Sequence, residues 1–417
     1  MVKIDNQNYN NEEVKTYKLD NGLRIIYYPT PSPVSYCGYA VNAGTRDEKE
    51  EESGMAHFVE HLIFKGTEKR KAKHILNCLS DVGGDIDAFT NKEETIVYAT
   101  VLNEDCQRAI ELLSDIVFHS TFPSDELERE REVIMEEIKS YDDNPSELIY
   151  DDFENIVFKG HPLGRNILGK ADTISRFDTQ KVQDFTHRLY HPDNMVLFAS
   201  GRISFKSMIR WAEKYTNDLS WDTYEQIRLQ PEGYMPQHIH MDKGTYQTHC
   251  IIGCPGYKAY DYRAAGLYLL NNLLGGPAIN NRLNFSLREK KGLVYTVESN
   301  ITPYTDTGIF CIYFGTEKRN LGRCMELTYK ELKKFRDTQL TSRQLSSAKK
   351  QLTRQLRIAS DNDENNMLDI GKIYLHYNRY ETLQNTCAQI ESLTAEKLLE
   401  IANDKFSEDN LTTLIYQ

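Results

Sequence analysis

Residues 54–66 read GMAHFVEHLIFKG, a segment whose apolar residues recur at helical spacing. They form one stripe: Met55, Phe58, Val59, Leu62 and Ile63. Such a stripe is typical of an amphipathic helix with one buried face. Gly54 precedes the pattern, and Ser53 is expected to cap the helix. The segment therefore predicts a short helix that packs against a core.

Two histidines and a glutamate stand on this helix in the order His57, Glu60, His61. Positions i and i+4 lie about 40° apart around a helix axis, so both imidazoles can bind one ion from the same side. Two neutral imidazoles suit Zn²⁺, and a neighbouring carboxylate that does not bind the ion suits a general base. The spacing is the HxxEH pattern of inverzincin metalloproteases. The alternative is an amphipathic helix with two half-buried histidines and no metal.

A catalytic zinc needs a third protein ligand, and the segment SDELEREREVIMEEIKSY at residues 124–141 offers the best candidates. Its apolar residues fall within about 60° of arc and define the buried face of a helix: Leu127, Ile134, Ile138 and Tyr141. Glu136 points directly away from that face, whereas Glu137 and Glu130 lie on its edge. Glu137 is therefore the predicted ligand, and Glu130 is a candidate partner that orients a ligand from behind.

Three segments of the first half align with three of the second half at slowly drifting offsets. GMAHFVEHLIFKG aligns with AAGLYLLNNLLGG from Ala264, IVYATV from Ile96 with IFCIYF from Ile309, and SDELEREREVIMEEI from Ser124 with SRQLSSAKKQLTRQL from Ser342. Small loop insertions explain such drift, so the chain is expected to contain two copies of one α+β unit. The predicted domains are residues 1–222 and 223–417, each with a mixed β-sheet and packed helices.

The second copy lacks the metal-binding side chains. In the alignment His57, Glu60, His61 and Glu137 stand opposite Leu267, Leu270, Asn271 and Gln355. The first copy is therefore the predicted zinc-binding catalytic domain, and the second is a homologous domain without metal.

The combined motifs resemble those of the pitrilysin-type (M16) peptidases, above all the short bacterial members and the mitochondrial processing peptidase β-subunit. HFVEH is followed by a glutamate 76 positions after the second histidine. Further matching stretches are LDNGLRIIYYPTP, VNAGTRDE, FKGT, GGDIDAFTNKEET, HPLGRNILG and LREKKGLVYTV. The resemblance runs from about Val14 to the C-terminus. It implies the LuxS/MPP-like metallohydrolase architecture, with two homologous domains.

The resemblance also implies roles for individual residues. One Zn²⁺ per chain is expected on His57, His61 and Glu137, with Glu60 activating water. The arginine–tyrosine pair that assists catalysis from the second domain of the family maps onto Arg288 and Tyr295. The substrate-side strand maps onto Asp87, Ala88 and Phe89, where many members have Asn in the first position. This strand is expected to pair with an extended peptide.

The charge of the chain bears on its partners. The formal net charge is −12, and residues 125–154 contain 13 acids against three bases. This balance argues against nucleic acid as a partner. It is compatible with attraction of basic or extended peptides, because a surface of one charge sign concentrates ligands of the other. A solvated acidic helix that aids solubility explains the acids equally well.

The sequence indicates a cytoplasmic protein. It has no apolar run near the roughly 20 residues of a membrane span, and its N-terminus lacks the features of a secretory signal or transit peptide. The eight cysteines are scattered, and the closest pair, Cys250 and Cys254, is expected to lie in the core. A reducing compartment agrees with this usage of cysteine.

The expected activity is zinc-dependent endopeptidase cleavage of peptides or unfolded precursor segments enclosed in a chamber. A homodimer is expected, because the chain carries both the zinc motif and the Arg288–Tyr295 pair. One alternative is a catalytically silent structural or assembly subunit of the same fold. Another is an enzyme that works only in a heterodimer.

Overall fold

The structure is a computed structural model that describes residues 14–217, 219, 221 and 226–417. Two compact units divide the chain. Unit 1 comprises Met1–Ile138, Arg165–Arg228 and Ser360–Glu381, and unit 2 comprises Lys139–Gly164, Leu229–Ala359 and Thr382–Gln417. The predicted boundary between residues 222 and 223 lies outside the described residues and stays a prediction.

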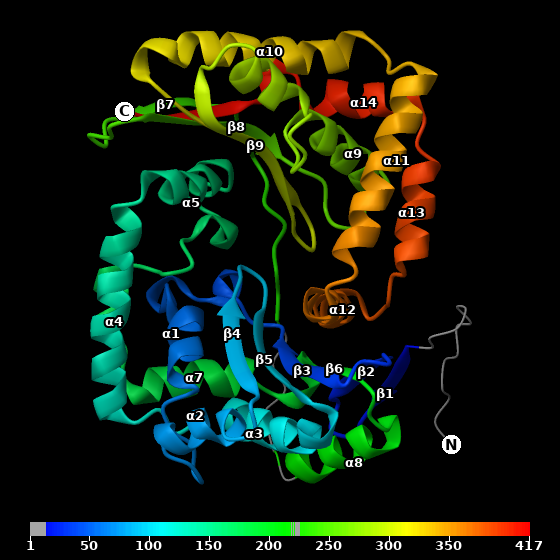
Figure 1. The fold of residues 1–417 in the computed structure, drawn as a ribbon. Coiled ribbons are helices and arrows are strands. Elements are labelled where there is room, and N and C mark those ends of the chain that lie inside the picture. The colour runs from blue at the N-terminus through cyan, green and yellow to red at the C-terminus, as the bar shows by residue number, and fades with distance from the viewer. Residues whose placement is uncertain (1–13, 218, 220, 222–225) are drawn as a thin grey trace. The chain divides into compact units, whose positions relative to one another are not determined.

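Unit 1 is built on a six-stranded sheet in the order β1-β2-β6-β3-β5-β4 (Figure 1). The strands are β1 (Lys15–Lys18), β2 (Arg24–Pro29), β3 (Val34–Val41), β4 (Asp85–Thr90), β5 (Thr95–Leu102) and β6 (Met195–Gly201). β2 and β6 run parallel, and all other neighbours run antiparallel. The sheet is therefore mixed, as predicted.

Unit 2 is built on a five-stranded sheet in the order β7-β11-β8-β10-β9. The strands are β7 (His238–Met241), β8 (Thr248–Pro255), β9 (Val294–Pro303), β10 (Gly308–Thr316) and β11 (Thr412–Tyr416). β7 and β11 run parallel and the other neighbours antiparallel. Without β1, the sheet of unit 1 has the same order and the same strand directions. This agreement confirms the α+β class with two homologous sheets.

Helices pack on both sheets. Those of unit 1 are α1 (Met55–Leu62), α2 (Ala72–Ser80), α3 (Cys106–Phe118), most of α4 (Ser124–Asp142), α6 (Ala171–Ile174), α7 (Thr179–Leu189), α8 (Phe205–Thr216) and α12 (Asp363–Tyr377). Those of unit 2 are α5 (Pro145–Val157), α9 (Ala264–Leu274), α10 (Leu321–Asp337), α11 (Ser342–Ala359), α13 (Leu383–Glu391) and α14 (Ala395–Lys405). The segments aligned in the sequence form the same elements: α1 and α9, β5 and β10, α4 and α11.

Successive strand residues point to opposite faces of a sheet, and helices pack on both faces of each sheet. In unit 1, one face packs under α1, α3, α7 and α8, and the other face packs under α12. In unit 2, one face packs under α9, α10 and α14, and the other packs under α5. Each unit therefore has helices on both sides of its sheet.

Two of these helices come from the opposite half of the sequence. α5 follows α4 in the first half but packs on β8 and β11 of unit 2, whereas α12 follows α11 in the second half but packs on β3 and β6 of unit 1. We call α5 and α12 the exchanged helices. Gly371 of α12 meets the sheet closely, since a Cβ there would lie 2.6 Å from the ring of Phe198. Each sheet is thus completed by a helix that the other half of the sequence supplies.

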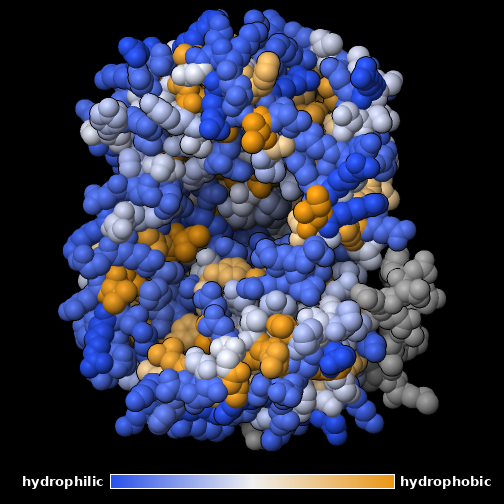
Figure 2. Space-filling view, viewed as in Figure 1, coloured by the Kyte–Doolittle hydropathy of each residue, from blue (hydrophilic) through white to orange (hydrophobic). Residues whose placement is uncertain are grey.

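Apolar side chains and cysteines lie mainly inside the units. On the face drawn in Figure 2, hydrophobic residues occur in small groups between hydrophilic ones. All eight cysteines are free, and seven are buried, including Cys250 and Cys254, as expected. No helix in the described part of the chain is both long and apolar enough to cross a membrane.

Candidate metal centre

The helix that carries the histidines begins at Gly54, which has a φ of +92°. A Cβ at this position would lie 2.8 Å from the carbonyl oxygen of Leu168, so both the backbone conformation and the space favour glycine. The predicted cap by Ser53 is wrong. The buried carboxylate of Glu48 accepts the N–H groups of Gly54 at 3.0 Å and Ala56 at 2.9 Å. Burial raises the pKa of Glu48 to about 8, although both of these hydrogen bonds oppose the rise.

The apolar stripe of α1 fixes which way the histidines face. Met55, Phe58, Val59 and Leu62 are fully buried. His57 and His61 therefore leave the helix together on another side, with ring centroids 4.7 Å apart. Burial, and then the nearby His61, lowers the pKa of His57 to about 4. His57 is consequently neutral at pH 7, as a metal ligand must be.

Glu137 of α4 lies opposite the two imidazoles. Its Oε2 is 3.8 Å from Nε2 of His57 and 3.8 Å from Nε2 of His61. These three residues form the only group of metal-ligand type found in the described chain, with candidate ligand atoms within 4.8 Å of one another. Glu136 is exposed and does not belong to the group.

The separations in this group suit a metal ion better than direct hydrogen bonds. A distance of 3.8 Å is beyond hydrogen-bond range. A tetrahedral zinc ion with ligands at about 2.1 Å holds them about 3.4 Å apart, close to the separations seen here. Two imidazoles and one carboxylate also match the ligand type of catalytic zinc sites, which keep a fourth position open. His57, His61 and Glu137 therefore fit Zn²⁺.

Glu130 contacts the group from behind, at the position where the helical wheel puts it. Its Oε2 lies 3.0 Å from Nδ1 of His61, and its Oε1 lies 2.7 Å from Nζ of Lys65. A carboxylate at Nδ1 favours the tautomer that leaves Nε2 free for a metal. Sequence reasoning missed Lys65, although its spacing of four residues from His61 was a usable signal.

Glu60 lies beside the group without joining it. Its Oε2 is buried and has no hydrogen-bond partner among the described residues. Burial raises the pKa of Glu60 to about 7, opposed by a hydrogen bond from Thr90 and by His61, and supported by the charges of Asp87 and Glu137. A bound cation would lower this pKa again. A carboxylate with such a pKa can accept and return a proton near neutral pH.

The strand predicted to contact substrate lies next to this site. β4 is the last strand of its sheet and pairs only with β5 among the described strands. Asp87 is exposed, and Ala88 and Phe89 are partly buried. β4 also packs against α1, the helix that carries Glu60. An open strand edge therefore lies beside the metal centre within unit 1.

Arg288 and Tyr295 belong to unit 2. Arg288 lies in the helical turn Asn284–Glu289, and Tyr295 lies in β9 with 68% of its surface exposed. Both side chains are exposed to solvent. Their predicted contribution to catalysis stays a prediction.

The second-copy positions carry no metal-binding set. On α9, Leu267 and Leu270 are buried in the core of unit 2. The buried oxygens Oδ1 of Asn271 and Oε1 of Gln355 have no hydrogen-bond partner within the described ranges. Unit 2 therefore keeps the helices of the metal centre without its chemistry.

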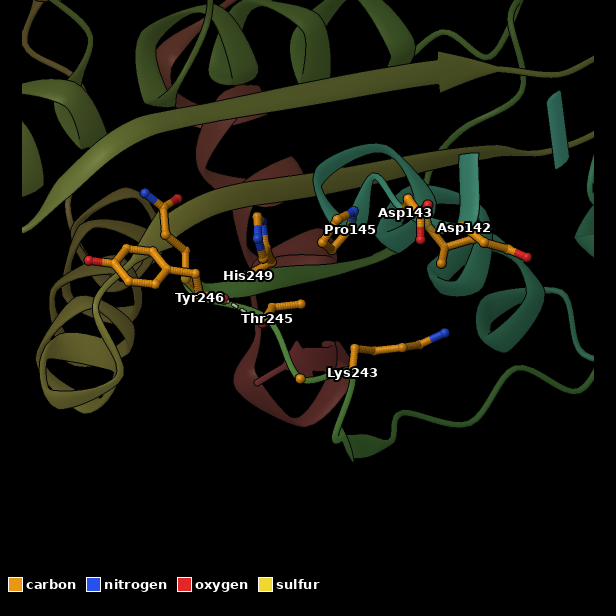
Figure 3. Close-up of a pocket in the computed structure, with 10 residues that line it drawn as sticks. Asp142, Asp143, Pro145, Lys243, Thr245, Tyr246 and His249 are labelled. Carbon is orange, nitrogen blue, oxygen red and sulfur yellow. Dashed lines mark hydrogen bonds between the residues drawn. The ribbon is translucent and has the colours of Figure 1, made fainter. Parts of the chain in front are cut away.

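Unit 2 has a cavity of about 490 Å³ between the start of α5 and the loop before β8 (Figure 3). Asp142, Asp143, Lys243, Tyr246 and His249 are among its lining residues. Nδ1 of His249 lies 2.8 Å from the hydroxyl of Tyr313. Both residues of this pair are buried. Two carboxylates, a lysine and a histidine thus share this cavity.

Comparison with known proteins identifies the family. Residues 24–171 match the family described as Insulinase (Peptidase family M16), and residues 176–352 match Peptidase M16 inactive domain. The Bacillus subtilis protein named Uncharacterized zinc protease YmxG is 33% identical over 407 residues, which cover 96% of this chain and 98% of that protein. An Uncharacterized zinc protease of Rickettsia bellii is 32% identical, with 97% and 98% covered.

Solved structures agree on the fold. A crystal structure described as peptidase M16 inactive domain from Pseudomonas fluorescens matches with a TM-score of 0.89 and 20% identity, covering 97% of each chain. A protease from Helicobacter pylori matches with a TM-score of 0.87 and 22% identity, covering 97% of this chain and 100% of that one. Because relatives above 30% identity extend along nearly the whole sequence, the chain belongs to peptidase family M16.

Proposed function

We propose that this protein is a zinc-dependent endopeptidase. The observation that carries the proposal is the convergence of His57, His61 and Glu137 on one point. Beside them lies Glu60, whose buried Oε2 has no hydrogen-bond partner in the described part of the chain. In such a set three side chains bind the metal and a fourth transfers protons. Metal-assisted hydrolysis of a peptide bond uses both functions. The names of the relatives as zinc proteases support the same activity.

The roles of the residues follow from their positions. Zinc, when bound, polarises a peptide carbonyl and acidifies water. Glu60 accepts a proton from the attacking water and returns it to the leaving amine, a role for which a pKa near 7 is suited. Glu130 holds His61 in the tautomer that binds metal.

The edge of β4 is the proposed binding surface for substrate. Its free backbone groups can pair with an extended peptide, and the side chains of Asp87, Ala88 and Phe89 then flank the bound residues. A peptide bound there would run beside α1, because β4 packs against that helix. Extended or unfolded segments are therefore the proposed substrates.

A preference for basic peptides is part of the proposal. The segment 125–154 is strongly acidic, and Asp142 and Asp143 have exposed carboxylates at the cavity of unit 2. These carboxylates attract cationic side chains more strongly at low salt. The rate for a basic peptide should therefore exceed that for an acidic peptide of equal length, and this ratio should shrink as salt is added.

Further details are proposed from the sequence alone. Arg288 and Tyr295 assist catalysis from unit 2, one zinc ion binds per chain, and the protein works as a cytoplasmic homodimer that encloses its substrate in a chamber. Sedimentation at micromolar concentration tests the homodimer. Substitution of Tyr295 by Phe tests the assisting role, because turnover should fall while zinc stays bound.

One experiment separates this function from a silent structural subunit. Quenched fluorescent peptides of extended, basic sequence are incubated with the purified protein, then with a chelator, then with zinc restored. An endopeptidase should cleave the peptides, stop when the chelator is added and resume when zinc is restored. Absence of cleavage by the zinc-loaded protein across a varied peptide set would favour the structural subunit.

A further inference from the structure

The turn between β4 and β5, residues 91–94, contains a buried carboxylate with three donors. The side chain of Glu94 is 1% exposed. Its Oε1 accepts from Nζ of Lys372 at 2.8 Å and from Nδ2 of Asn91 at 2.8 Å, and its Oε2 accepts from Nε2 of His376 at 2.9 Å. Both oxygens of the carboxylate therefore accept hydrogen bonds, which fix the side chain in one orientation.

Two of these donors come from the exchanged helix α12. Lys372 and His376 are four residues apart, so they share one side of the helix. α12 is itself held at both ends. Glu364 near its start accepts from the hydroxyl of Tyr98 at 2.9 Å, and Arg24 donates to the carbonyl oxygens of residues 374 and 375 at 3.0 Å each. The helix that carries two of the donors to Glu94 is thus itself held in place by hydrogen bonds.

The energetics of Glu94 depend on these partners. Burial alone would raise its pKa, but the hydrogen bond from His376 and the charge of Lys372 lower the pKa to about 2. A buried ion pair adds little net stability, whereas loss of one partner leaves an uncompensated charge and is strongly destabilising. Such a group fixes geometry more than it stabilises the fold.

The same turn leads directly into the candidate site. It connects to β4, which packs against α1, the helix that carries Glu60. Other residues of the turn are held by unit 1 as well, since Glu93 pairs with Arg46 at 2.6 Å. A shift of the turn would therefore move β4 relative to α1 and Glu60.

We propose that Lys372 and His376, acting through Glu94, are positioning residues that align β4 with Glu60 of α1. The inference rests on the proposed function, and it assigns a role in the reaction to residues more than 300 positions away from the HxxEH motif. The second half of the sequence thereby supports catalysis from inside unit 1.

Unit 2 provides a matched control. Its exchanged helix α5 also bonds to the β-hairpin of the sheet, because Glu154 accepts from the hydroxyl of Tyr304 at 2.9 Å next to the turn between β9 and β10. The control variant Tyr304→Phe removes a hydrogen bond from the corresponding hairpin, and it leaves the turn 91–94 intact.

The test uses the zinc-loaded full chain. Lys372→Met is the main variant, because this side chain is 42% exposed. Asn91 and His376 still donate to Glu94 in this variant, so the protein should stay folded. Hydrogen exchange of the amides of β4 and the following turn is measured together with kcat, KM and zinc content. Lys372→Arg keeps the charge and serves as the rescue variant.

The expected result is faster exchange at residues 85–94, a fall in kcat of about 10–100-fold and unchanged zinc content. Lys372→Arg should stay within about twofold of the unmodified protein, and Tyr304→Phe should change exchange only in unit 2. Unchanged exchange at residues 85–94, or faster exchange with unchanged kcat, would overturn the inference. Failure of the unmodified zinc-loaded protein to cleave peptides would instead contradict the proposed function, while the exchange data still test the contact.

Discussion

Unit 1 and unit 2 have the same arrangement of five strands, yet only unit 1 carries the histidines and glutamates of the candidate metal site. On α1 the critical positions carry His57, Glu60 and His61, whereas α9 carries Leu267, Leu270 and Asn271. The strand order and directions are unaffected by this change. The comparison teaches that the scaffold specifies where a site can form, and that a few side chains decide whether it does.

The exchanged helices show a second difference. In unit 1 the hairpin contact to α12 joins the carboxylate of Glu94 to the ammonium group of Lys372 and the imidazole of His376. In unit 2 the hairpin contact to α5 joins a tyrosine hydroxyl to Glu154. The stronger and more directional set therefore lies beside the candidate site.

Separating the two halves of the sequence should have the largest effect on stability. A fragment of residues 1–221 lacks α12, so the face of its sheet that contains Ile26, Ile96 and Phe198 loses its cover. Exposure of each such side chain costs about 1.5–3 kcal/mol. We expect the fragment to bind a hydrophobic dye and to unfold without a cooperative transition, unlike the full chain. A fragment that unfolds cooperatively and binds one zinc ion would show that the exchange is dispensable.

Glu60→Gln tests the division of labour inside unit 1. The amide cannot accept the proton of water, so kcat should fall by about 10²–10⁴-fold. Zinc content, measured by mass spectrometry of the metal, should remain near that of the unmodified protein. Loss of the metal in this variant would mean that Glu60 is a ligand.

The neighbouring residues Glu137 and Glu136 form a matched pair on α4. Glu137→Gln removes a charged ligand, so zinc affinity in chelator competition should fall by more than the roughly 10–100-fold that an outer partner costs. Glu136→Gln, at an exposed position one residue away, should leave the affinity unchanged. Equal losses in both variants would refute the assignment of Glu137.

The two units also differ at the position of Glu130, because the aligned residue of unit 2 is Ala348. Glu130→Gln removes the charge that pairs with Lys65 and weakens the orientation of His61. Zinc affinity should fall by about 10–100-fold, and Glu132→Gln on the exposed side of α4 should change nothing. An unchanged affinity in Glu130→Gln would reduce Glu130 to a structural contact.

Local patterns predicted much of the fold. The spacing of apolar residues located α1 and α4, and the internal alignment located α9, β10 and α11, because short-range periodicity follows the geometry of one element. The exchange of α5 and α12 was not predicted. Amphipathic spacing says that a helix covers something apolar, but it does not say which of two similar sheets is covered.

In the candidate site, too, local patterns predicted some features and missed others. The structure brings the carboxylates of Glu137 and Glu130 next to the histidines, where their wheel positions put them, and the roles of both residues stay predictions. The cap of α1 was not predicted correctly, because Glu48 reaches the helix from six residues upstream of Gly54 and no local pattern marks it. Lys372 and His376 were also missed, since their partner Glu94 lies more than 270 residues earlier in the chain.

Native mass spectrometry of the zinc-titrated full chain, combined with peptide cleavage at each loading, tests the central claim most directly. The account predicts one tightly bound zinc ion per chain and cleavage that rises in proportion to its occupancy. No tightly bound ion, a second equivalent ion, or a fully loaded protein that leaves peptides intact would contradict it.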